Sequence, residues 1–161
     1  MHERSPKNSA MDVLLYEREM LKHCAETVND KQARFTQSFS DQDKSEYYLG
    51  IEGFLLHFRN LLGFFINKGS QRTDMTLGKT TSWANGMVVD QTISKGFTER
   101  AQEVNKKHGL GPGDCYQKIS RFLQHMTTHR HQEARSWDIE NMFADFKPLL
   151  DEFVQHFAPN A

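Results

Sequence analysis

Three side chains that can do chemistry interrupt the apolar run FLLHFRNLLGFF at residues 54–65. His57 can exchange a proton near neutral pH, Arg59 can bind a carboxylate or a phosphate, and Asn60 can donate and accept hydrogen bonds. A helix turns by about 100° per residue, so His57 and Asn60 share one side of it whereas Arg59 lies on the opposite flank. The three groups are either partnered residues at the edge of a core or parts of a polar site completed by other segments.

A second polar stripe lies in KISRFLQHMTTHR at residues 118–130. Its basic side chains recur every three or four residues beside the apolar face: Lys118, Arg121, His125 and His129. Arg130 falls near the apolar centre at the end of the expected helix, where the helix dipole favours a cation. The stripe is either a solvated basic face or the partner of His57 and Arg59 in a site. The candidate ligand-binding residues are His57, Arg59, Asn60, His125, Thr127 and Arg130.

The histidine spacing does not complete a metal site. His125 and His129 are one helical turn apart, but a metal needs a third ligand, and the sequence has neither an HExxH motif nor a Cys/His cluster. Cys115 lies about 15 Å along a helix from His125, too far for a nucleophile and its base. We therefore predict no metal and no cofactor. No catalytic residue is assigned, and the candidates for that role are His57, Arg59 and His125.

Apolar residues spaced three and four apart indicate the elements that must position these groups. Helices are predicted over residues 11–38, 43–67, 97–108 and 113–131, and from Ser136 onward. The helix over 43–67 is apolar on more than one side, so we expect it at the centre of the fold. Ser136 is the predicted N-cap of the last helix, and Pro148 should kink or break that helix.

These helices favour an all-α fold, with residues 1–161 forming a single domain. The expected architecture is an antiparallel four- to five-helix bundle. A long loop excursion at about 68–96 is rich in Gly, Ser, Thr and Asn. A loop of that length is mobile or functional, or contains a short element such as residues 87–89.

Composition limits the partners and the compartment. Twenty basic and 21 acidic side chains give a formal charge of −1, so affinity for nucleic acid or an anionic membrane would require a local patch. Cys24 and Cys115 are far apart and form no CxxC motif, which indicates reduced thiols and a cytoplasmic protein. A bilayer span needs about 20 mostly uncharged residues, and Arg59 interrupts the longest apolar run. We expect a soluble chain with no membrane contact.

The two polar segments resemble an uncharacterised family of small bacterial helical proteins. That family combines a His-x-Arg-Asn-Leu helix with a later His-Leu-Thr-x-x-Arg helix and a nearby Trp. The matching positions here are His57, Arg59, Asn60 and Leu61, then His125, Met126, Thr127 and Arg130, then Trp137. Met126 replaces the usual Leu. The resemblance implies the helical order but no activity.

The chain is also similar to HEPN domains, which are helical bundles of bacterial toxin and defence modules. Active members cleave RNA with an Arg, a polar residue, and a His four to six residues after the Arg. Arg59 and Asn60 match the start of that motif, but residues 64–66 are Phe-Phe-Ile. The implied ribonuclease centre would therefore need His57 or His125 to replace the missing group.

Two functional hypotheses follow from these patterns. The leading one is a non-enzymatic or regulatory module whose His/Arg/Asn residues order the core or bind a small anionic or nucleotide-like ligand. The rival is a metal-independent ribonuclease in which His57 or His125 transfers a proton and Arg59 or Arg130 stabilises phosphate charge. A homodimer with the polar residues at its interface is a third hypothesis. RNA or a nucleotide is thus one expected partner, and a second copy of the chain is another.

Overall fold

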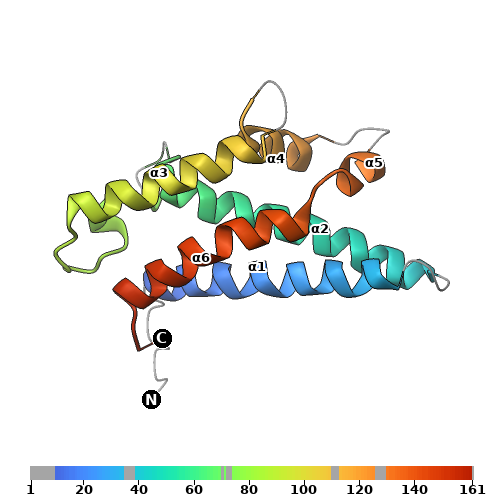
Figure 1. Cartoon of the computed structure of the whole chain (residues 1–161), viewed down its shortest axis with the longest axis horizontal. Helices are drawn as coiled ribbons and strands as arrows, with labels where there is room; N and C mark the ends of the chain where they lie inside the picture. The colour runs from blue at the N-terminus through green and yellow to red at the C-terminus, as the bar shows by residue number, and fades with distance from the viewer. Residues whose placement is uncertain are drawn as a thin grey trace, which may run out of the picture.

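The computed structural model describes residues 10–34, 39–69, 71, 74–109, 113–125 and 130–160. Over these residues the protein is built from α-helices and one short 3-10 helix, without a β-strand (Figure 1). The all-α prediction is therefore confirmed. In chain order the helices are α1 (Ala10–Ala33), α2 (Asp41–Phe65), α3 (Gln91–Lys107), α4 (Cys115–Gln124), α5 (Arg130–Arg135) and α6 (Ile139–Phe157).

Helix α2 lies at the centre of the bundle, as its apolar pattern predicts. It packs along α1 as an antiparallel hairpin and also contacts α3, α4 and α5 (Figure 1). Helix α6 packs against α1 and α3 and reaches α2 through aromatic contacts, of which Phe58 with Phe146 is one. The central helix can therefore carry polar side chains on several flanks, each facing a different neighbour.

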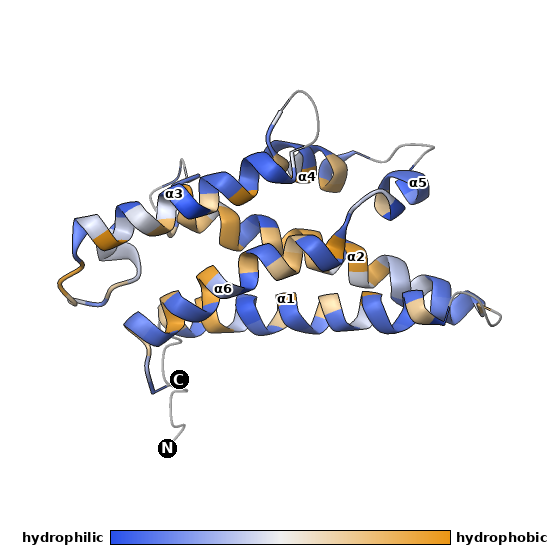
Figure 2. Ribbon diagram, viewed as in Figure 1, coloured by the Kyte–Doolittle hydropathy of each residue, from blue (hydrophilic) through white to orange (hydrophobic). Residues whose placement is uncertain are grey.

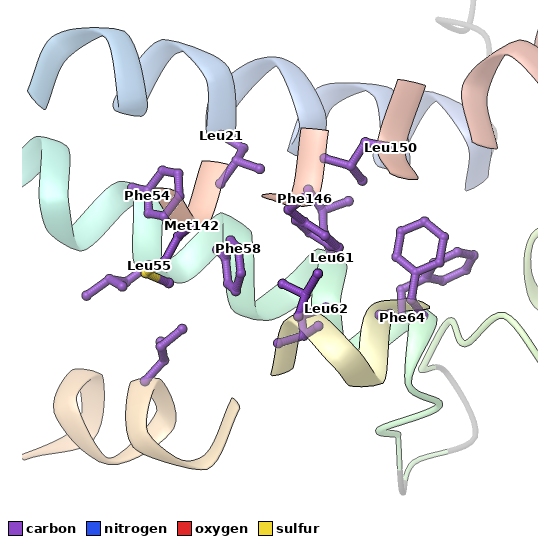
Figure 3. Close-up of a cluster of buried hydrophobic side chains, with 14 of the residues drawn as sticks. Leu21, Phe54, Leu55, Phe58, Leu61, Leu62, Phe64, Met142, Phe146 and Leu150 are labelled. Atoms are coloured by element: carbon purple, nitrogen blue, oxygen red, sulfur yellow. The ribbon is translucent and has the colours of Figure 1, made fainter. Parts of the chain in front are cut away.

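The apolar stripes of α1, α2 and α6 face inward and form most of the core, while polar residues line the outer faces (Figure 2). Buried residues of α3, α4, α5 and the α2–α3 segment complete the core. Figure 3 shows Phe54 and Phe58 of α2 beside Met142 and Phe146 of α6, with Leu21 of α1 above them. All five side chains are buried. Replacing one such Phe by Ala costs about 3–5 kcal/mol.

Both ends of α2 are fixed by polar contacts. At its start, the Ser40 hydroxyl accepts from the Asp43 N–H at 3.1 Å and the Asp43 carboxylate accepts from the Ser40 N–H at 3.2 Å, a reciprocal capping box. At its end, Asn67 adopts a φ of 59° and its side-chain oxygen accepts from the Gly78 N–H at 2.6 Å. The Thr98 hydroxyl of α3 donates to the Phe65 carbonyl at 2.9 Å. The last turn of α2 is thus held by the following loop and by α3.

The excursion is shorter than predicted and packs on the core. It runs from the end of α2 to the start of α3 at Gln91, and its short element is the 3-10 helix Thr80–Ser82 rather than residues 87–89. Trp83 is 1% exposed and its indole N–H donates to the Leu77 carbonyl at 3.1 Å. The ring of Trp83 packs against Phe153 of α6. Because a large ring is buried here, the loop closes one end of the bundle.

Helix α3 and the region after it depart from the sequence prediction. Helix α3 starts at Gln91 and not at residue 97, because Asp90 caps it by accepting from the Thr92 N–H at 2.7 Å. The single helix predicted over 113–131 is divided into α4 and α5, since the backbone becomes extended at His125. The bundle therefore has six described helices instead of four or five.

The last helix also begins and continues differently from the prediction. Its N-cap is Asp138 and not Ser136, because the Asp138 carboxylate accepts from the Asn141 N–H at 3.2 Å. The helix runs unbroken through Pro148 to Phe157. Pro148 and Ala144 are both exposed, so the carbonyl of Ala144 that loses its N–H partner can bind water.

Candidate functional site

Arg59 is held on the side of α2 that faces α4. Its Nε–H donates to the Ser120 hydroxyl oxygen at 2.6 Å, and its guanidinium carbon lies 4.9 Å from the centre of the Tyr116 ring. Ser120 in turn donates to the Tyr116 carbonyl at 2.8 Å. No carboxylate of a described residue forms an ion pair with Arg59. The terminal nitrogens of its guanidinium therefore keep donors for a ligand.

Tyr116 is positioned by a glycine and a buried amide. A Cβ at Gly63 would lie 2.9 Å from Cε2 of the Tyr116 ring, so the ring packs directly on the backbone of α2. The Asn105 side-chain oxygen accepts from the Tyr116 N–H at 2.9 Å, and Asn105 is 1% exposed. This amide joins the end of α3 to the first turn of α4. Arg59 thus contacts a rigidly placed ring.

His57 and Asn60 face α1, on the other side of α2 from the Arg59–Tyr116 contact. The Glu17 carboxylate oxygen Oε2 lies 2.8 Å from Nδ1 of His57 and accepts from Nδ2 of Asn60 at 3.3 Å. The ring of Tyr16 contacts the His57 ring edge-on, with 6.1 Å between their centres. His57 is 8% exposed. The imidazole is therefore a buried, partnered group that positions Glu17.

A cavity of about 790 Å³ lies over the last two turns of α2, between α1, the following loop and Tyr116. We call it the Arg59 cavity. Its polar lining residues are Glu17, Arg59, Asn60, Asn67, Lys68, Gln71, Asp74 and Tyr116. Among the residues described, neither Lys68 nor Arg59 has an acidic partner.

The carboxylates of the Arg59 cavity are already bound within the protein. Glu17 contacts His57 and Asn60, and the Asp74 side chain accepts from the Gln71 N–H at 2.8 Å. Arg59 and Lys68 form no ion pair among the described residues, so both cations can pair with a bound anion.

Arg130 forms a separate contact at the junction of α4 and α5. Its Nη1 donates to the Phe122 carbonyl at 2.7 Å and to the His125 carbonyl at 2.9 Å, and its Nε donates to the Glu52 carboxylate at 3.0 Å. The guanidinium carbon lies 4.6 Å from the centre of the Phe122 ring. A cation at the end of α4 was predicted, but it arrives from α5 and ties both helices to α2.

The structure does not bring the six predicted residues into one site. Arg59 and Asn60 share the Arg59 cavity, and His57 reaches it through Glu17. His125 and Arg130 lie at the α4–α5 junction, and no described contact joins either to His57 or Arg59. Thr127 lies outside the described residues.

Three residues of this region were missed at the sequence level: Glu17, Lys68 and Tyr116. Glu17 interrupts the apolar stripe of α1 between Leu14 and Leu21, as His57 interrupts the apolar run of α2, so the sequence did contain a signal for it. Tyr116 and Ser120 are one turn apart on α4, a spacing that indicates a shared face. No sequence pattern indicated Lys68, because it follows α2 in a loop, where helical periodicity does not apply.

The cysteines offer no nucleophile. Both thiols are free and buried, and burial raises the pKa of Cys115 to about 12. A thiol with that pKa is protonated at neutral pH and therefore a poor nucleophile. Within the part of the chain that the structure describes, no group of three His, Cys, Asp or Glu side chains is placed to hold a metal ion.

Comparisons of the chain with models of known families, with curated proteins and with solved structures found no match. The resemblances to the bacterial helical family and to HEPN domains therefore stay predictions. None of the described helices has the length and apolar character needed to cross a membrane.

Proposed function

We propose that this protein is a non-enzymatic helical module that binds a small organic anion, such as a nucleotide-like molecule, in the Arg59 cavity. The observation that supports this most directly is the Arg59 guanidinium, which lines the cavity without a carboxylate partner among the described residues. An arginine that stays unpaired in a cleft is well suited to binding carboxylate or phosphate.

The cavity combines charge with apolar walls. Arg59 and Lys68 supply the positive charge, and Val13 and Met75 supply accessible apolar surface. Small-molecule sites typically enclose about 300–1,000 Å³ and pair apolar walls with a few placed polar groups, and this cavity falls within that range. A ligand with an anionic group and a flat or apolar body fits this lining.

The contacts around Arg59 support binding more than the ribonuclease hypothesis. That hypothesis requires His57 or His125 within hydrogen-bond reach of a phosphate bound at Arg59. Neither is among the described lining residues of the Arg59 cavity: His57 lies behind Glu17, and His125 lies at the α4–α5 junction. The ribonuclease hypothesis stays a prediction, which cleavage of RNA by the protein would support.

The test compares three probes on the unmodified protein by isothermal titration calorimetry: AMP, inorganic phosphate and adenosine. We expect AMP to bind most tightly, because it offers both an anion and a flat body. Arg59→Gln should weaken AMP binding by about tenfold or more, since hydrogen bonds to charged groups are the strong ones. Arg34→Gln is the matched control, because Arg34 is exposed and pairs with Asp30 at the far end of α1.

Two results would contradict the proposal. If AMP, phosphate and adenosine all fail to bind, or if Arg59→Gln binds AMP as the unmodified protein does, the cavity is not an anion site. If single-stranded RNA is cut without added metal and Arg59→Gln abolishes the cutting while circular dichroism is unchanged, the ribonuclease hypothesis takes its place.

A further inference from the structure

A second cavity, of about 320 Å³, lies between α4 and the chain that follows α5. We call it the Trp137 cavity. The side chains that matter for its chemistry are Lys118, Arg121, Phe122, His125, Glu133 and Trp137. Lys118, Arg121 and Phe122 are spaced as i, i+3 and i+4 along α4, so they form one face, and His125 is the C-cap that follows it. It is separate from the Arg59 cavity and shares no lining residue with it.

The floor of the Trp137 cavity is aromatic. The rings of Phe122 and Trp137 meet edge to face, with 6.2 Å between their centres. The guanidinium carbon of Arg130 also lies over Phe122, at 4.6 Å from its ring centre, and its bonds to Glu52 and to two carbonyls hold it there. Phe122 is 6% exposed while Trp137 stays half-buried. The Trp137 indole is therefore the part of this floor that an incoming apolar group can cover.

The rim of the cavity is basic. Lys118, Arg121 and His125 stand on it, against one carboxylate, Glu133. Among the described residues neither Lys118 nor Arg121 forms an ion pair. The chain as a whole has a formal charge of −1, so this concentration of cations beside an aromatic floor is local.

We infer that the Trp137 cavity binds a small aromatic carboxylate, with the ring against Trp137 and the carboxylate between Lys118 and Arg121. Ring burial supplies the apolar contact, since aromatic pairs favour edge-to-face and offset-stacked arrangements. The basic rim selects the acid over a neutral or cationic analogue of the same shape. The small volume favours one ring with a short acidic arm over a nucleotide. The inference is independent of the function proposed for the Arg59 cavity.

Three probes of nearly equal shape separate charge from ring burial: phenylacetate, phenylacetamide and phenethylamine. Binding is followed by NMR through the indole N–H signals of the two tryptophans. Trp83 is an internal control, because it is buried in the segment between α2 and α3, its N–H is bound to the Leu77 carbonyl, and it does not line the Trp137 cavity. We expect phenylacetate to shift the Trp137 signal and leave the Trp83 signal in place.

Phenylacetamide, which is neutral, should bind at least about threefold more weakly than phenylacetate, as expected for the loss of partly exposed ion pairs. Phenethylamine, which is a cation, should bind more weakly than the amide. Arg121→Gln and Lys118→Gln should each reduce the preference for the acid. Both residues lie on the rim, so the fold should survive, and circular dichroism checks that. Lys95→Gln is the matched control, since Lys95 is exposed on α3 and lines neither this cavity nor the Arg59 cavity.

The inference is overturned if phenylacetate leaves the Trp137 signal unmoved, or if the three probes bind equally. It is also overturned if Arg59→Gln removes phenylacetate binding while Arg121→Gln does not, since the acid would then occupy the Arg59 cavity. Loss of AMP binding in Arg59→Gln with phenylacetate binding intact would support two separate sites.

Discussion

At the residue scale, Gly63 decides where Tyr116 lies, and Tyr116 is the ring under Arg59. A methyl group at residue 63 would stand 2.9 Å from that ring, closer than carbon atoms normally approach. We predict that Gly63→Ala moves the ring and loosens its contact with Arg59. The protein should become about 1–3 kcal/mol less stable than the Gly96→Ala variant, as overpacked positions do.

Gly96→Ala is the matched variant. Gly96 also lies inside a helix, α3, but a Cβ there meets nothing within 4 Å. Alanine should therefore stabilise α3 by about 0.5–1 kcal/mol. Urea unfolding of both variants measures the difference, and the NMR signal of the Arg59 Nε–H reports the ring movement. Equal stabilities and an unchanged Arg59 signal would show that Tyr116 adapts without cost.

Residue spacing predicted the directions of the polar groups better than their partners. The turn of about 100° per residue placed His57 and Asn60 together and Arg59 apart, and the contacts follow that division. Glu17, which joins His57 and Asn60, is 40 residues away from His57 along the chain. The apolar stripe of α1 indicates its inner face but not which of its turns lies beside His57, so this partner requires the tertiary structure.

At the element scale, the α1–α2 hairpin is fastened near its turn by Lys31. Its ammonium lies 2.9 Å from the Asp43 carboxylate and also pairs with Glu46. The hydrogen bond from Lys31, followed by those from Ser40, lowers the pKa of Asp43 from 3.8 to about 2. A carboxyl whose folded pKa is depressed stabilises the fold above its unfolded pKa and loses that contribution as pH falls through the folded value.

We therefore predict that Lys31→Gln lowers stability at neutral pH and that this difference shrinks as pH falls from 3.8 to about 2. Thermal unfolding across that pH range measures it. Lys22→Gln is the control, because the Lys22–Glu26 pair is exposed and spans 4.0 Å within α1 alone. A difference between Lys31→Gln and the unmodified protein that stays constant with pH would contradict a role for the Asp43 carboxylate.

The positions of helices were predictable where apolar residues recur for many turns. They were least predictable where a capping residue or a contact from another helix sets the boundary. The stripe of α2 gave its extent to within two residues at each end. The chain leaves the helix at His125 although the apolar spacing continues, and Arg130 then binds the carbonyls exposed at the end of α4. The end of α4 is stabilised by Arg130 of α5, and the spacing of apolar residues gives no information about such a contact.

At the scale of the whole molecule, composition and apolar spacing predicted the helical bundle. They did not predict that the segment between α2 and α3 packs over one end of it. Turn-forming residues made the segment after α2 look like an open loop. Within it Leu77, Trp83 and Ala84 are buried and pack on the bundle. Three apolar residues at irregular spacing form no periodic signal, so their burial could be found only from the fold.

Trp83 therefore tests whether the excursion is a structural part of the bundle. Its ring packs on Phe153, its N–H binds the Leu77 carbonyl, and the Leu77 N–H binds the Phe64 carbonyl of α2 at 2.9 Å. Trp83→Phe keeps a ring but leaves the buried carbonyl unpaired, which should cost about 1–3 kcal/mol. We also expect faster hydrogen exchange of the Leu77 amide, because the loop then opens locally.

Trp137→Phe is the matched substitution, because Trp137 is half-buried and its indole has no hydrogen-bond partner among the described residues. It should change stability by less than about 1 kcal/mol and leave exchange at Leu77 as it was. Urea unfolding and amide exchange on both variants separate the outcomes. If Trp83→Phe exchanges at Leu77 like the unmodified protein, the loop is held by its other contacts. Lys68 and Met75, which line the Arg59 cavity, would then be held in place without Trp83. The hydrogen bonds between the loop and Phe64 and Asn67 would be sufficient to hold that part of the chain against α2.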